Sequence, residues 1–238
     1  MYQPQTNYNR TYAPQGSALS FPAVMQKVYL WMTLALAMTG LTSLAVVTQP
    51  ALMNAIFSAP FLFYGLLIAE VGLVWFLSAR IHKLSFMTAG VLFALYAILN
   101  GVTLSSIFLV YAQATIVNAF LITAGTFGAM SFVGLFIKKD LSMIGRILSM
   151  AVIGLIIALV VNMFWGNSMF DLLISLAGVV IFTGLTAYDT QKIKRLVTQY
   201  SQMDEESTMK VALMGSLTLY LDFVNLFLYI LRLLGRRR

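Results

Sequence analysis

The chain has 238 residues, of which 60% are hydrophobic and only 10% are charged, and its mean hydropathy is +0.87. This balance excludes an ordinary soluble domain and indicates an integral membrane protein. The net charge of +7 does not predict a nucleic-acid partner, because the Lys and Arg lie between and beyond apolar runs, and the absence of cysteine excludes disulfides and a thiol nucleophile.

The first 22 residues are polar, contain Pro and Gly, and lack an apolar core. They are therefore not a cleaved signal peptide, and we expect residues 1–22 to form a flexible cytoplasmic tail. Residues 23–238 are expected to form one transmembrane domain, because the connections between its apolar runs are short. The first helix would serve as an uncleaved insertion signal.

Seven apolar runs follow the tail, each long enough to cross a hydrocarbon core of about 30 Å as a helix. The runs are continuously apolar rather than alternating, which favours a helical bundle over a β-barrel. The sequence therefore predicts an all-α polytopic membrane protein with seven transmembrane helices. The predicted segments are Val24 to Val47, Ile56 to Ala79, Phe86 to Tyr111, Ile116 to Ile137, Ile144 to Trp165, Leu172 to Tyr188 and Val211 to Leu234.

Basic residues alternate between the loops. They occur around Arg80 and Lys83, at Lys138 and Lys139, and in the longest loop, 192–210, whereas the loops between these carry none. The alternation predicts that the N-terminus and the basic loops are cytoplasmic. The terminal LGRRR would then lie outside, against the rule that basic residues stay in the cytoplasm. Either the last segment re-enters the membrane without crossing it, or the basic early loops determine the topology despite these late charges. We expect seven crossings.

Two pairs of small residues at a spacing of four, Gly65 with Ala69 and Gly125 with Ala129, suit close contact between helices in lipid. The same spacing is common by chance in apolar helices, so it does not indicate any particular interface.

Asp222 falls near the middle of the last segment, where a charge costs at least about 2.5 kcal/mol. On a helical repeat it shares a face with Gly215, Thr218, Asn225 and Tyr229. This stripe is expected to point into the bundle, and Asn225 is a candidate for an ion path.

A second acid, Asp189, lies at the predicted end of the sixth segment. About twelve residues separate Lys210 from Asp222, roughly 18 Å of helix, so contact between the two acids needs a tilt, an unwound start or a cavity. If the carboxyl groups touch, they cannot both ionise cheaply, and they share a proton. Such a pair is a pH sensor, and its loss of that proton would separate the helices or give calcium a transient oxygen site.

Two further charged residues lie within the second segment or directly at its end. Arg80, at its cytoplasmic end, either bridges the aspartates as a latch or simply extends toward the membrane surface. Glu70 either lines an ion path or bonds to a polar face formed by Tyr96, Asn100 and Thr103 on the third segment.

The stretches FTGLTAYDTQKIK (182–194) and SLTLYLDFVNLFLYILRLLG (216–235), with NGVTLSSIFLVY (100–111) and GAMSFVGLFIKKDLS (128–142), resemble the Bax inhibitor-1 family, and most of all its bacterial inner-membrane members. The resemblance implies a fold whose last helix is central among the other six. It also implies a pH-sensitive calcium leak controlled by Asp189 and Asp222, with Arg80 as the interacting arginine and Glu70 matching a second-helix acid. Calcium would be the permeant ion, and no tightly bound cofactor is expected. The loop between the two aspartates is longer than in compact bacterial members.

Two other functions compete with a leak. An intramembrane aspartyl protease also places two acids on consecutive helices, but Leu219, Tyr220 and Leu221 replace the Gly-x-Gly that such enzymes use before their second acid, so we expect no enzyme. The alternative that stays open is an interaction protein that modulates a membrane protease or a stress-response complex, with the N-terminal tail as its handle.

Overall fold

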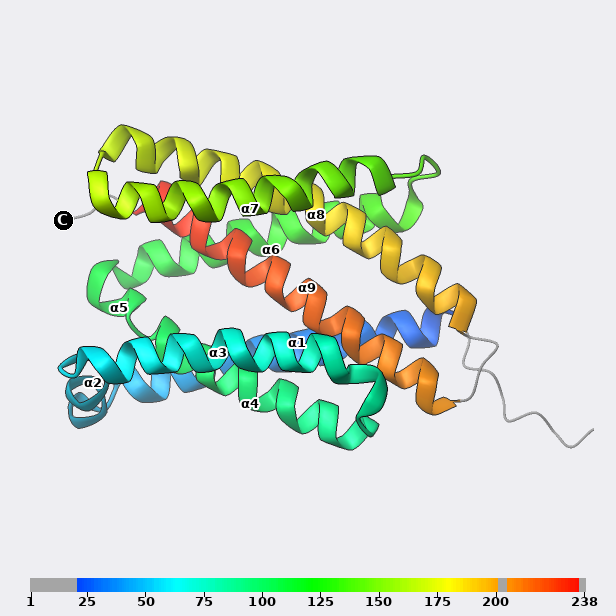
Figure 1. Cartoon of the computed structure of the whole chain (residues 1–238), viewed down its shortest axis with the longest axis horizontal. Helices are drawn as coiled ribbons and strands as arrows, with labels where there is room; N and C mark the ends of the chain where they lie inside the picture. The colour runs from blue at the N-terminus through cyan, green and yellow to red at the C-terminus, as the bar shows by residue number, and fades with distance from the viewer. Residues whose placement is uncertain (1–20, 201–204, 236–238) are drawn as a thin grey trace, which may run out of the picture.

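A computed structural model describes residues 21–200 and 205–235 (Figure 1). This part of the chain contains nine α-helices, one 3-10 turn and no strand, and seven of its helical segments are long and apolar enough to cross a membrane. The predicted fold class and the seven segments are confirmed. The helices are α1 (Phe21–Val47), α2 (Pro50–Phe57), α3 (Pro60–Arg80), α4 (Phe86–Leu104), α5 (Ile107–Val110), α6 (Gln113–Phe136), α7 (Ser142–Trp165), α8 (Ser168–Tyr200) and α9 (Glu205–Leu234), and the 3-10 turn is η1 (Ile81–Lys83).

The second and third predicted segments are each divided in the structure. Pro50 and Pro60 begin α2 and α3, where a missing backbone N–H has no consequence, so a short helix precedes the spanning one. The third segment breaks between α4 and α5, where the hydroxyl of Ser105 donates to the carbonyl of Val102 and that of Ser106 to the carbonyl of Thr103. The predicted tail lies outside the described residues except for its last two, which already belong to α1.

The expectation of a long loop between the last two segments is wrong. α8 continues for 33 residues to Tyr200 and α9 begins at Glu205, so most of residues 192–210 is helical. An apolar run marks only the part of a helix that lies in lipid, and this polar extension contains neither Pro nor Gly to end a helix. Asp189 consequently lies inside α8 and not at its end.

α9 runs diagonally between two groups of helices, with α6, α7 and α8 on one side and α1, α3 and α4 on the other (Figure 1). It packs against α8, α1, α6 and α4, and 72% of its apolar stretch is buried, against 6% to 39% in the other six segments. α3 packs mainly on α4, and α7 on α8. That all six other segments surround the last helix stays a prediction.

The loops divide between two ends of the bundle. The start of α1, the α3–α4 and α6–α7 turns and the end of α8 lie at one end, which carries the predicted basic loops and is called the basic end here (Figure 1). α2, α5, the α7–α8 turn and the C-terminal end of α9 lie at the opposite, far end. The last segment therefore traverses the whole bundle and does not re-enter.

The helices approach most closely at glycines outside the two pairs with a spacing of four. A side chain at Gly101 would meet the carbonyl oxygen of Thr39 on α1, and one at Gly134 would meet the carbonyl oxygen of Ala187 on α8. Gly65 and Gly125, in contrast, have no neighbour within 4 Å of the place that a methyl group would take, so no described helix packs closely against either glycine. Spacing alone cannot tell a lipid-facing glycine from one that faces a helix.

Candidate functional site

The structure brings Asp189 of α8 and Asp222 of α9 together. Both side chains are buried, with exposed fractions of 9% and 5%, and their carboxyl groups lie within hydrogen-bonding reach of each other. The close packing of α8 on α9 and the polar extension of both helices make this contact possible without an unwound segment.

The residues around the pair are buried. In the described part of the chain, Oδ2 of Asp222 is buried and receives no hydrogen bond from any N–H or O–H donor. The neighbouring Thr186 and Thr190 are fully buried, and Thr186 directs its hydroxyl to the carbonyl of Phe182 on its own helix. Two carboxyl groups can bond to each other only if one carries a proton, so the arrangement favours a protonated donor and an ionised acceptor.

The predicted latch is not formed in this structure. Arg80 is exposed at the end of α3, and no ion pair joins it to either aspartate or to any other described residue. The positive charge whose field acts on Asp189 belongs instead to Lys192, one helical turn further along α8, which also lies 5.9 Å from the centre of the Tyr188 ring.

A polar anchor that the sequence analysis missed follows Asp189 on α8. Gln191 accepts a hydrogen bond from the backbone N–H of Leu141 at 2.9 Å and donates to the carbonyl of Lys139 at 2.8 Å. Arg195, one turn later, donates to Asp140 at 2.7 Å. The hydrogen bond from Arg195 holds the pKa of Asp140 well below its usual range. This anchor ties α8 to the α6–α7 loop, and its signal in the sequence was a polar pair at i, i+4.

Glu70 belongs to a second buried polar group, on the opposite side of α9. Its carboxylate accepts from the hydroxyl of Thr103 at 2.7 Å and from the amide of Asn100 at 3.3 Å, as one of the two sequence interpretations expected. The hydroxyl of Tyr220 donates to Oδ1 of Asn100 at 3.0 Å and lies 2.8 Å from the hydroxyl of Thr39. These five residues, called the tyrosine network here, join α1, α3, α4 and α9.

Asn225 and a possible metal site are the remaining predictions about this region. The amide of Asn225 donates to the carbonyl of Leu221 at 2.8 Å, within α9, so this donor does not reach either aspartate. Within residues 21–200 and 205–235, no three His, Asp or Glu side chains are grouped so that they could hold a metal ion. Two carboxyl groups alone form an incomplete calcium site, which suits brief contact with an ion in transit better than storage.

The chain is similar in sequence to a known protein family and to several bacterial proteins. Residues 22–238 match the family model described as inhibitor of apoptosis-promoting Bax1. The chain is 45% identical over 214 residues to the inner membrane protein YbhL of Escherichia coli K12. The matched region covers 90% of this chain and 92% of the relative. The chain is similarly 45% identical to an uncharacterized protein of Borreliella burgdorferi, with the same coverage, and 41% identical to one of Deinococcus radiodurans over 88% of each chain.

Proposed function

The chain belongs to the Bax inhibitor-1 family, and on this premise we propose that it is a pH-sensitive calcium leak channel gated by Asp189 and Asp222. We place it in the bacterial inner membrane, as the name of the Escherichia coli relative suggests, with its N-terminus and basic end in the cytoplasm.

The buried contact between the two carboxyl groups is the observation that carries the proposal. One proton shared between Asp189 and Asp222 leaves a single negative charge at the α8–α9 contact. Loss of this proton leaves two, and like charges about 4 Å apart repel by a few kcal/mol, roughly 4 at an effective dielectric constant of 20. Energies of this size are sufficient to shift a two-state equilibrium between closed and open helix packing.

The leak would therefore be closed at low pH and favoured at higher pH. Calcium prefers oxygen ligands, and two ionised carboxylates would offer a transient contact once the helices separate. Arg80 stays a proposed latch: its exposed side chain forms no ion pair in the described part of the chain and would have to move to reach the aspartates. Glu70 is better suited to a structural role than to the ion path, since both of its oxygens accept hydrogen bonds.

Calcium entry into liposomes, measured from pH 5 to pH 8 with purified protein, tests the proposal. Asp189→Asn and Asp222→Asn should each remove most of the pH dependence, because neither an amide nor a lone buried carboxyl reproduces the shared proton. Glu206→Gln is a matched control: this exposed acid pairs with Lys210, one turn along α9, and its variant should keep the full pH response.

Two outcomes would sink the proposed mechanism. A full pH response in both Asn variants would remove the pair from the gate. No flux above that of empty liposomes, from protein shown to be folded, would favour the second function, an interaction protein that modulates a membrane protease or a stress-response complex.

We further propose that the pair is not catalytic. Leu219 and Tyr220 are fully buried just before Asp222, and they fill the space that an extended substrate backbone would need. Cleavage of a membrane peptide that depends on both aspartates would overturn this.

A further inference from the structure

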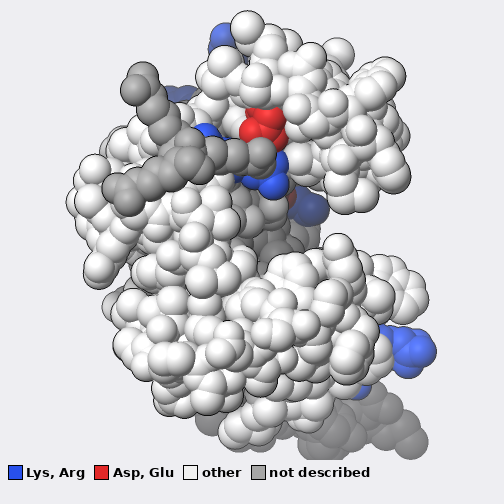
Figure 2. All heavy atoms as spheres, turned by 90° about the vertical axis from the view of Figure 1, so that its left-hand side faces the viewer, with Lys and Arg blue, Asp and Glu red and all other residues white. Residues whose placement is uncertain are grey.

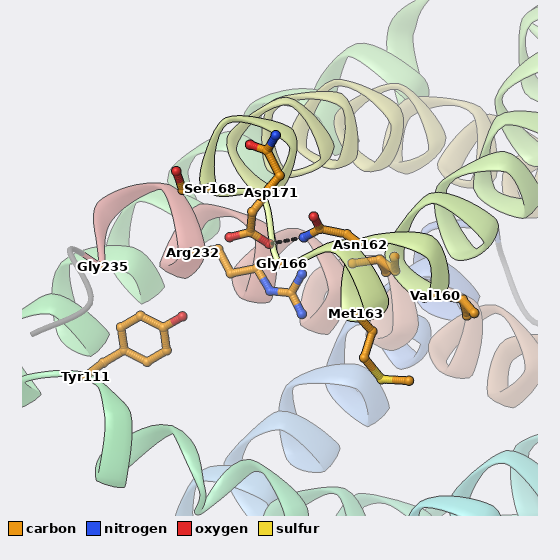
Figure 3. Close-up of a pocket in the computed structure, with 11 residues that line it drawn as sticks. Tyr111, Val160, Asn162, Met163, Gly166, Ser168, Asp171, Arg232 and Gly235 are labelled. Atoms are coloured by element: carbon orange, nitrogen blue, oxygen red, sulfur yellow. Dashed lines mark hydrogen bonds between the residues drawn. The ribbon is translucent and has the colours of Figure 1, made fainter.

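A pocket at the far end of the bundle carries charged groups that the leak does not use. It has a volume of about 590 Å³, within the range of small-molecule sites, and lies where α7, α8 and α9 end or begin (Figure 3). Its polar lining includes Tyr111, Asn162, Ser168, Asp171 and Arg232. Figure 2 views the molecule from this end and shows a mostly uncharged surface that is hollowed between the two groups of helices.

Arg232 lies over an aromatic ring at the end of α9. Its guanidinium lies 5.8 Å from the centre of the Tyr229 ring, an attractive cation–π arrangement. That ring in turn stacks on Phe182 at 5.7 Å and rests where Gly178 has no side chain. Arg232 forms no ion pair with any described residue, so an exposed, unpaired positive charge faces the pocket.

The other wall of the pocket gathers hydrogen-bond acceptors. The amide of Asn162 donates to Oδ1 of Asp171 at 3.4 Å (Figure 3). Its carbonyl oxygen, Oδ1, is buried and has no donor in the described part of the chain. Asp171 forms no ion pair there either, although Arg232 lines the same pocket. Asp171 is therefore the charged acceptor that this wall offers to a ligand, and a charged N–H donor would suit it best.

We propose that this pocket binds a zwitterion that carries a phosphate ester and a primary ammonium, namely the phosphoethanolamine headgroup of a phospholipid. The phosphate would lie against Arg232, and the hydroxyl of Tyr111, on the same pocket lining, would supply a further donor. The ammonium would lie against Asp171, the carboxylate that lines the same pocket, and would donate its N–H groups to it. Opposite charges that share a pocket without pairing match a ligand with two opposite charges.

The lining favours a lipid over a soluble zwitterion. Val160 and Met163, which belong to the same pocket, are exposed and continue into the apolar outer surface of α7. The pocket also lies at the ends of three membrane-spanning helices, which is the depth of lipid headgroups. Acyl chains could therefore follow the helix surface while the headgroup occupies the pocket. This lipid site does not depend on the proposed leak.

Lipid retention by the full-length protein in detergent, titrated by native mass spectrometry, tests the site. Phosphatidylethanolamine should bind about tenfold more tightly than phosphatidylglycerol, which lacks the ammonium, and more tightly than phosphatidylcholine, whose quaternary nitrogen has no N–H to donate. Arg232→Gln should weaken both phosphatidylethanolamine and phosphatidylglycerol at least tenfold. Asp171→Asn should weaken phosphatidylethanolamine alone, so that its preference over phosphatidylglycerol is lost.

Controls separate binding from folding. Arg146→Gln removes an exposed arginine near the basic end of α7 and should leave every affinity unchanged. Arg232→Lys keeps the charge and should retain the preference for phosphatidylethanolamine if Arg232→Gln proves unstable. Equal affinity of the unmodified protein for the three lipids, or no effect of Arg232→Gln in folded protein, would overturn the site. Equally tight binding of water-soluble glycerophosphoethanolamine would overturn its assignment to a lipid.

Discussion

The two polar faces of α9 differ in how completely their groups are satisfied. On the face toward α1 and α4, the Tyr220 hydroxyl contacts Thr39 and donates to Asn100. On the face toward α8, only two residues further along, Asp222 meets Asp189 and leaves a buried oxygen without a donor in the described part of the chain. α9 therefore carries, on two of its faces, a network whose polar groups are hydrogen-bonded and a carboxyl pair that leaves one oxygen without a hydrogen bond.

This difference separates structural polar groups from responsive ones. A buried network whose donors and acceptors are matched stabilises one packing of the helices. A carboxyl pair that needs a proton to be satisfied makes its packing depend on the proton supply. The number of buried polar groups alone would not distinguish the two faces, whereas the balance of donors and acceptors does.

The largest expected effect comes from adding a methyl group at the closest helix contacts. Gly101→Ala forces α4 away from α1 beside Thr39, and Gly134→Ala forces α6 away from Ala187 and Thr190, which flank Asp189. Each should lower the free energy of unfolding by about 1 to 3 kcal/mol, because a backbone carbonyl cannot move aside cheaply. Thermal and denaturant unfolding in micelles would measure this.

The same glycine variants distinguish the faces through the leak. Only Gly134→Ala should also change the pH dependence of calcium flux, since only it disturbs the helix that holds the pair. Gly125→Ala, where no atom lies within 4 Å, should be neutral in both measurements. A changed pH response in Gly101→Ala alone would reverse the roles assigned to the two faces.

A smaller effect is expected from removing the acid of the tyrosine network. Glu70→Leu takes away the acceptor of the Asn100 amide and should lower the free energy of unfolding by about 1 to 2 kcal/mol. The pH profile of calcium flux should stay the same, and Asp222→Asn should give the opposite pattern. If Glu70→Leu abolished the pH response while the protein stayed folded, Glu70 would belong to the ion path after all.

The hydroxyl of Tyr220 should contribute less again. Tyr220→Phe keeps the edge-to-face contacts with Phe93 and Tyr96, at 5.6 and 5.8 Å, and removes only the hydrogen bonds to Asn100 and Thr39. We expect a loss of about 0.5 to 1.5 kcal/mol in unfolding free energy. The losses caused by Thr39→Val and Tyr220→Phe should not add fully when the two variants are combined, because each of them breaks the same contact between Thr39 and Tyr220. Full additivity would argue against a shared network.

The sequence predicted the parts of this comparison that depend on single segments. A charge in mid-membrane marked Asp222, and one helical face marked the Asn100 and Thr103 partners of Glu70. Tyr220 escaped notice because it lies among leucines on a face that looked apolar. Its role depends on Asn100, 120 positions away, and such a contact follows from the packing of helices and not from their periodicity.

The lengths of α8 and α9 were missed for a related reason. Their polar extensions have the composition of a solvated loop, and hydropathy cannot tell a solvated helix from a loop. Gln191 and Arg195 lie on this extension, so the anchor to the α6–α7 loop could not be predicted once 192–210 was expected to be a loop. The role of Arg80 as a latch stays a prediction, since the structure leaves this side chain exposed and without an ion pair in its described part.

The smallest effect on the leak is expected at the anchor, which tests whether any carboxylate near the basic end can act as the sensor. The hydrogen bond from Arg195 holds the pKa of Asp140 well below its usual range, so its folded-state value lies below the unfolded value of about 3.9. Its contribution to stability is therefore present above about pH 4 and lost as the pH falls further.

Between pH 5 and pH 8 Asp140 stays ionised, and Asp140→Asn should leave the pH profile of calcium flux unchanged. Below pH 4 the unmodified protein should lose stability on acidification more steeply than this variant in thermal unfolding. A shift of the flux profile by Asp140→Asn as large as that of Asp189→Asn would mean that exposed charge, and not the buried shared proton, sets the response.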